Sequence, residues 1–231
     1  PGGIMVTRAA AGAAATITEM GLSVMLLYQR MMRVTGGPAA TAWAMDVTGM
    51  VNKHATSEVS LWMGAYGAPA GTLGWSTMLE KLSQVDDFNA KMAADSDVAA
   101  KVSEATNYVA DVDVDRLVAL IHGSVTDSAP VGSYIGAVRA VAAPGKWMAA
   151  GEWAAHIAGI YSETTDLPVV VGTTTAGPMG EYSWFVRHAN GDSIEAAMAA
   201  TMSSEKYIKE VEQGGEFFQP GAVQMYAQRL V

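Results

Sequence analysis

The chain has 231 residues, half of them apolar and 16% charged, which supplies a large core and does not fit a disordered protein. A net charge of −9 opposes binding to nucleic acid or to an anionic membrane, and the absence of cysteine excludes disulfides and thiolate sites. No apolar run reaches the roughly 18 residues of a membrane span. We expect a globular, cytoplasmic protein.

The first half of the chain is predicted to contain a strand, a helix, two strands, a helix and a strand. Residues 1–19 are rich in alanine and predict a flexible leader. The expected elements are a strand over 22–34, a helix from Pro38 to about Lys53, strands from Val59 and around Trp75, a helix from Ser83 interrupted at 94–97, and a strand over 111–122. Residues 123–133 combine Ser, Thr, Asp, Pro and Gly without periodicity, and therefore predict a linker.

The second half repeats this order. Strands are expected over 134–141, 167–173, 182–188 and 222–230, with helices from Trp147 to about Tyr161 and from Asp192 onward. Gly71 and Trp75 have counterparts 109 positions later, at Gly180 and Trp184, and Trp43 has one 110 positions later, at Trp153. Such steady spacing predicts a duplicated unit of about 105 residues. We therefore expect two domains, over residues 20–123 and 133–231.

Local sequence adds a resemblance to a known superfamily. The segment Gly71-Thr72-Leu73-Gly74-Trp75, the amphipathic helix after it and the break at Ala93-Ala94-Asp95-Ser96 resemble NIPSNAP-like sequences. The tandem βαββαβ pattern over about residues 20–231 resembles the ferredoxin-like dimeric α+β barrel superfamily, which also includes antibiotic-biosynthesis-monooxygenase-like families. The resemblance implies an α+β fold in which two ferredoxin-like domains form a pseudo-dimeric barrel. It also implies a cavity for small, often apolar molecules, in families that include cofactor-free oxygenases, isomerases, cyclases and haem proteins.

Four histidines have a reference pKa near neutrality and are the first acid/base candidates. His54 is expected at a helix C-terminus, where it more simply satisfies terminal carbonyls. His122 and His188 lie at predicted strand ends, where a rigid element can hold an imidazole toward a cavity, so we select both as catalytic candidates. His156, on a predicted helix, is the candidate axial ligand if the protein binds haem.

Aromatic residues gather on the strand-turn-strand units of both halves. Tyr66 and Tyr182 are candidate acid/base or orienting groups, and Trp62, Trp75 and Trp184 are candidate walls for a flat apolar ligand. The simpler alternative is that these rings only form the core.

Three arginines, Arg30, Arg139 and Arg187, fall within predicted strands. Each needs either a carboxylate partner, such as Glu58, Glu152 or Glu181, or a ligand anion. Arg187 is therefore added to the candidate ligand contacts.

Metal and nucleotide motifs do not support a further site. Asp111-Val112-Asp113-Val114-Asp115 resembles the start of a calcium loop, but Arg116 stands where glycine is required, so we expect no metal. The glycine-rich turns do not match nucleotide-binding patterns, and GxSxG and HExxH do not occur.

These observations predict a cofactor-independent enzyme of oxygenase, cyclase or isomerase type, acting on a small, largely apolar molecule in specialised metabolism. Two alternatives stay open: a haem-binding member of the same superfamily, and a non-catalytic protein that binds a small ligand. The expected partner is that small molecule, with no nucleic acid and no membrane, and formation of a homodimer is left open.

Overall fold

A closed barrel of eight antiparallel strands forms the centre of the protein in the computed structural model, which describes residues 25–112 and 115–231. Around the barrel the strands are β1 (Leu26–Val34), β3 (Thr72–Leu79), β2 (Val59–Tyr66), β9 (Val223–Arg229), β6 (Tyr134–Val141), β8 (Glu181–His188), β7 (Val169–Ala176) and β5 (Arg116–His122), which pairs back with β1. A short strand, β4 (Val109–Val112), pairs with the other end of β1. The expected α+β barrel is confirmed, whereas the leader expected over 1–19 and the predicted strand start at Leu22 lie outside the described residues.

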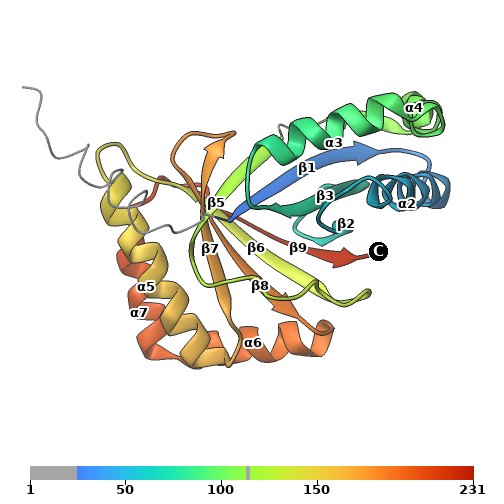
Figure 1. Cartoon of the computed structure of the whole chain (residues 1–231). Helices are drawn as coiled ribbons and strands as arrows, with labels where there is room; N and C mark the ends of the chain where they lie inside the picture. The colour runs from blue at the N-terminus through green and yellow to red at the C-terminus, as the bar shows by residue number, and fades with distance from the viewer. Residues whose placement is uncertain (1–24, 113–114) are drawn as a thin grey trace, which may run out of the picture.

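Helices cover the outside of the barrel (Figure 1). The first half carries α2 (Pro38–Asn52), α3 (Ser83–Ala94), α4 (Ser96–Ser103) and the 3-10 turn Glu104–Asn107, and the second carries α5 (Trp147–Thr165), α6 (Gly191–Ser203) and α7 (Glu205–Gly214). Within the described ranges, no helix has both the length and the apolar character needed to cross a membrane.

The second helix of each half is broken in two by a side-chain cap. Asp95 accepts hydrogen bonds from the backbone N–H groups of Asp97 and Val98 and starts α4, at the interruption predicted from the sequence. Ser204 accepts one from the N–H of Tyr207 and starts α7. This second break was not predicted from the sequence.

The two halves share their strands. The last strand of the first half, β5, pairs with β7 of the second half, and the last strand of the second half, β9, pairs with β2 of the first. Gly71 and Gly180, the equivalent glycines before β3 and β8, have φ angles of 78° and 77°, which explains why glycine occurs at both repeats. Alternate side chains of each strand point into the barrel, and the others point toward the helices.

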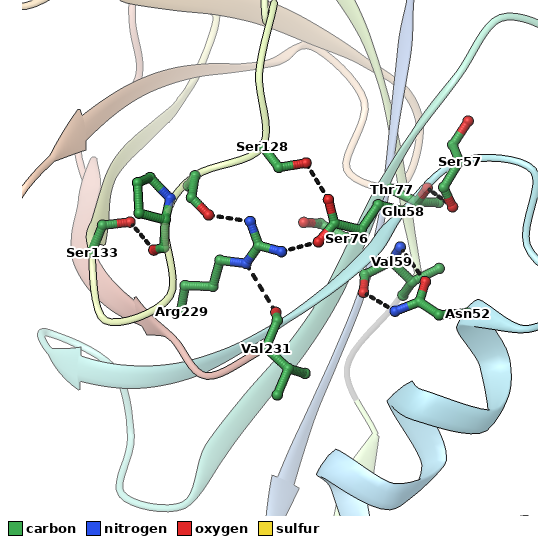
Figure 2. A network of polar contacts seen from close by, with 12 residues as sticks. Asn52, Ser57, Glu58, Val59, Ser76, Thr77, Ser128, Ser133, Arg229 and Val231 are labelled. Carbon is green, nitrogen blue, oxygen red and sulfur yellow. Dashed lines mark hydrogen bonds and ion pairs between the residues drawn. The ribbon is translucent and has the colours of Figure 1, made fainter.

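The linker crosses one end of the barrel and is attached there by polar contacts (Figure 2). The guanidinium of Arg229, which is buried on β9, pairs with the Glu58 carboxylate and donates to the carbonyl of Ala129. Ser128 donates its hydroxyl hydrogen bond to the same carboxylate. We call Arg229, Glu58, Ser128 and Ala129 the linker clamp.

Candidate functional site

An apolar pocket of about 370 Å³ lies between the sheet of the first half and helices α2 and α3. Helix α2 contributes Trp43, helix α3 contributes Phe88 and Met92, and the sheet contributes Tyr28 of β1 and Trp75 of β3. This volume falls within the range of roughly 300–1,000 Å³ that is typical of small-molecule sites. We call it the outer pocket.

The outer pocket exists because α3 does not pack closely on the sheet. Helix α3 buries none of its residues, whereas its counterpart α6 buries Ile194 and Ala197. In the second half, Phe218 packs against Trp184 and Tyr182, with ring centroids 5.5 and 5.9 Å apart. The first half therefore keeps an opening where the second half is filled by aromatic rings.

A hydrogen-bonded group of three side chains lies at the edge of this apolar pocket. The Tyr28 hydroxyl donates to Asp115 Oδ2 at 2.8 Å. Arg30 donates from Nε to Asp115 Oδ1 at 2.9 Å and from Nη2 to Oδ2 at 2.6 Å, the two-pronged geometry that guanidinium and carboxylate favour. Tyr28 and Arg30 are on the same face of β1 because strand side chains alternate. All three residues line the outer pocket.

These contacts change the acidity of all three groups. Burial, followed by the hydrogen bond to Asp115, raises the pKa of Tyr28 to about 12. The hydrogen bonds from Arg30 and Tyr28 hold the pKa of the Asp115 carboxyl below its usual range, and the contact with Asp115 raises the pKa of Arg30. At neutral pH the group therefore contains a neutral phenol, a carboxylate and a guanidinium.

A second cavity, of about 460 Å³, occupies the inside of the barrel. Its wall includes linker residues 124–129 at one end and Ala68, Thr72 and Arg139 toward the other. We call this cavity the lumen. The two cavities share four wall residues, Ser57, Trp75, Ser76 and Thr77.

No protein-family model and no curated protein sequence matches the chain, but solved structures do. A putative monooxygenase from Fusobacterium nucleatum aligns over 90% of this chain and 94% of its own, with a TM-score of 0.66 and 9% identity. An anthrone oxidase-like protein aligns over 90% and 92%, with a TM-score of 0.63 and 10% identity. A chlorite dismutase variant from Candidatus Nitrospira defluvii aligns over 93% and 95%, with a TM-score of 0.51 and 9% identity. The chain has the dimeric α+β barrel fold. At these identities the likeness establishes the fold and leaves the chemistry to the site.

The four acid/base candidates do not line either cavity of this dimeric α+β barrel. His122 is half-buried at the end of β5, opposite Val171. His188 is buried between the sheet and α6, with Nδ1 3.5 Å from the Ser193 hydroxyl. Tyr66 is exposed on the outer surface, and Tyr182 is buried in the second-half core, where its hydroxyl donates to the carbonyl of Trp147.

The barrel does bring together three of the four predicted ligand contacts. Trp62, Trp75 and Arg187 all line the lumen, and Trp62 Nε1 donates to the Ser76 hydroxyl at 2.8 Å. Trp184 lies instead in the second-half core and donates to the carbonyl of Ala154.

His156, the candidate haem ligand, lies on the solvent side of α5 with Nε2 3.3 Å from a carboxylate oxygen of Glu210. It is outside both cavities, and no histidine occurs among the described wall residues of either. The described residues therefore supply no histidine ligand for haem in these cavities. The described part of the chain also contains no cluster of three or more His, Asp or Glu side chains that could hold a metal ion.

Tyr28 and Asp115 were not selected as site residues from the sequence, although their partner Arg30 was marked as a charge that needs a partner. Arg30 was expected to need a carboxylate, and its partner is Asp115, not a glutamate. Of the suggested glutamates, Glu58 pairs with Arg229 and Glu181 lies 3.4 Å from Arg116. The signal that could have found Tyr28 is its strand phase, because it shares a face with Arg30 two positions away.

Proposed function

We propose that the outer pocket binds a flat, largely apolar molecule with an acidic hydroxyl or C–H group and removes that proton without a cofactor. The observation that carries this proposal is the Tyr28–Asp115–Arg30 group at the edge of a pocket walled by Trp43, Trp75 and Phe88. A hydrogen-bonded hydroxyl and carboxylate can move a proton, and apolar walls keep water from competing.

The proton follows a two-step path in this proposal. The substrate proton passes to the Tyr28 oxygen while the phenolic proton of Tyr28 passes to Asp115 Oδ2. Asp115 becomes neutral, so the positive charge of Arg30 is no longer balanced and stabilises the substrate anion. The lowered pKa of Asp115 makes this carboxylate a weak base. Stabilisation of the substrate anion by Arg30 offsets that weakness.

In the proposed oxygenase reaction, the substrate anion then reacts with molecular oxygen as the co-reactant. A CH₂ group that becomes C=O gives up four electrons, and O₂ accepts four when one atom enters the carbonyl and the other leaves as water with the two substrate protons. This step is supported by the fold likeness to a putative monooxygenase and to an anthrone oxidase-like protein. We therefore propose that the protein is a cofactor-independent oxygenase of small aromatic molecules.

Oxygen uptake with anthrone as the probe tests the proposal, because the carbonyl of anthrone acidifies the CH₂ group across the ring. Tyr28→Phe and Asp115→Asn should each lower turnover about 100-fold or more, the usual range for loss of acid–base catalysis. Because Arg30 holds the pKa of Asp115 low, turnover should persist through the usual Asp range and fall only in more acidic solution. Tyr134→Phe and Asp111→Asn, which change a tyrosine and an aspartate outside the outer pocket, are the matched controls.

Full activity in both pocket variants would refute the assigned roles of Tyr28 and Asp115. Anthrone that binds without oxygen uptake would support the alternative of a small-ligand-binding protein.

A further inference from the structure

We infer that the lumen is a second ligand site and that it binds a neutral aromatic molecule through a carbonyl oxygen. The proposed reaction in the outer pocket does not use the lumen, so this inference is independent of the proposed function. It depends on a row of hydrogen-bond donors on one side of the barrel, an apolar surface on the other side, and the space between them.

Three polar side chains lie next to one another on the inner face of β1, β3 and β2. Gln29 of β1 is paired in register with Ser76 of β3, and Ser76 is paired in register with Ser60 of β2. All three residues line the lumen. Residues that are directly opposite each other on antiparallel strands present their side chains on the same face, so the three side chains form a continuous row. We call Gln29, Ser76 and Ser60 the polar row.

The polar row has hydrogen-bond donors that the protein does not use. Gln29 Oε1 accepts from Arg139 Nη2 at 3.3 Å, which leaves the N–H bonds of the Gln29 amide available. Ser76 Oγ accepts from Trp62 Nε1 at 2.8 Å. Within the part of the chain that the structure describes, no group accepts from the Ser76 hydroxyl, and the Ser60 hydroxyl forms no hydrogen bond.

These donors select the chemistry of the ligand. A carbonyl oxygen has two lone pairs and can accept from two members of the polar row at once. Ser60 is only 9% exposed, so a bond from a ligand would satisfy a hydroxyl that is largely removed from bulk water. The donors are neutral groups, and the row therefore does not offset the cost of removing an ionised ligand from water. A neutral ketone or quinone fits it better.

The other side of the barrel is apolar. In the strand order, β8 is four strands from β3, so Phe185 of β8 lies on the strand across the lumen from Ser76. Phe185 packs with Ala137, and Ile135 and Met225 pack against them. An aromatic ring offers a flat face and a thioether adapts its shape to a ligand. A planar ligand that contacts Phe185 can therefore direct a carbonyl oxygen toward the polar row.

Small side chains leave room for such a ligand. The lumen volume of about 460 Å³ is within the range of roughly 300–1,000 Å³ that is typical of small-molecule sites. Gly74 lines the lumen two positions before Ser76, on the same face of β3. A Cβ atom at Gly74 would meet the Met31 side chain at 3.5 Å, an ordinary contact, so the backbone there does not require glycine.

Calorimetric titration of the full chain with 1-tetralone, compared with tetralin, tests the site. The two probes differ only in a carbonyl group that replaces a CH₂ group. Ser60→Ala should weaken tetralone binding about 3- to 10-fold, the effect of one lost hydrogen bond, and should leave tetralin binding unchanged. A variant that only disturbed the barrel would weaken both probes equally. Ser203→Ala, at an exposed serine on α6, is the matched control and should leave both affinities unchanged.

Two further variants assign the probe to one cavity. Gly74→Leu should weaken binding of both probes at least about 10-fold, because its side chain fills the lumen. Phe88→Ala removes a wall of the outer pocket alone and should leave tetralone affinity unchanged. Tetralone affinity that is unaffected by both Ser60→Ala and Gly74→Leu would overturn the lumen site. Loss of affinity in Phe88→Ala but not in Gly74→Leu would move tetralone to the outer pocket and would also overturn it.

Discussion

A single buried histidine gives the protein a specific response to acid. His188 is 1% exposed, and its ring packs against Tyr226 with centroids 5.8 Å apart. Burial lowers the pKa of His188, because the charged imidazolium would lose its hydration. The unfolded chain, in which the pKa is about 6.5, therefore binds a proton at a higher pH than the folded protein does. The contribution of the neutral histidine to stability is therefore fully present above the unfolded-state pKa. It is lost as the pH falls from there through the lowered pKa of the folded protein.

We predict that replacing this histidine flattens the acid dependence of stability. His188→Gln is neutral at every pH, so the free energy of unfolding should fall less between pH 7 and pH 5 than in the unmodified protein. Urea unfolding at a series of pH values measures the slope, and His156→Gln, at an exposed histidine, is the matched control. Equal slopes in His188→Gln and the unmodified protein would contradict this role.

Strand phase lets a sequence indicate which side of a strand a residue occupies, but it does not identify pairs of residues that meet through strand register. Trp62 and Arg187 were selected as ligand contacts and do line a cavity. Tyr28 and Asp115 are 87 positions apart, and they meet only because β1 and β5 pair with Tyr28 opposite Leu117. Spacing in one sequence contains no information about that register, so the group at the outer pocket could not be predicted.

At the scale of elements, the linker is an ordered part of the barrel end. The sequence predicted a segment without periodicity, and it could not show that the linker clamp would attach that segment to β9 and to the start of β2. The hydrogen bond from Ser128, together with the charge of Arg229, lowers the pKa of Glu58. The linker clamp is therefore strongest at a pH above the usual pKa of a glutamate. It is lost as the pH falls through the lowered pKa of Glu58.

We predict that breaking the linker clamp exposes the linker to proteases. Arg229→Ala removes the ion pair to Glu58 and the hydrogen bond to the Ala129 carbonyl, so cleavage between residues 123 and 133 should become faster. Limited proteolysis followed by mass spectrometry locates the cut, and Arg33→Ala, at an exposed position on β1, is the control. The same acceleration in the unmodified protein at acidic pH would be consistent with the lowered pKa of Glu58. Unchanged cleavage of Arg229→Ala would show that the linker is held by other contacts.

At the scale of the whole molecule, the two halves share a fold and differ in how completely they are packed. The order of elements and the repeat were predictable, because apolar periodicity and the 109-residue spacing are properties of the sequence itself. The difference in packing was not predictable, because it depends on where Phe217 and Phe218 lie after α7. These rings pack on Trp153, whereas its first-half counterpart Trp43 packs on Tyr108 and leaves the outer pocket open.

Equivalent tryptophans in the two halves allow this difference to be measured. Trp75 and Trp184 are equally buried, at 9% exposure, and each donates one hydrogen bond, to the Thr48 hydroxyl and to the Ala154 carbonyl respectively. Trp184→Ala should cost about 3–5 kcal/mol in unfolding free energy, because packed neighbours surround the cavity that it leaves. Trp75→Ala should cost at least about 1 kcal/mol less, because part of its ring already borders open space and makes no contacts there.

Urea unfolding of both variants, with the m-value compared to confirm that the same surface is exposed, gives the two free energies. Because chemistry, burial and hydrogen-bond count are matched, the difference between the two costs reports the packing around each ring. Equal costs would mean that the outer pocket closes in solution and that the first half is as well packed as the second. The proposed binding of a flat molecule beside Trp75 would then require the pocket to reopen, and its affinity would be reduced by the free energy of opening.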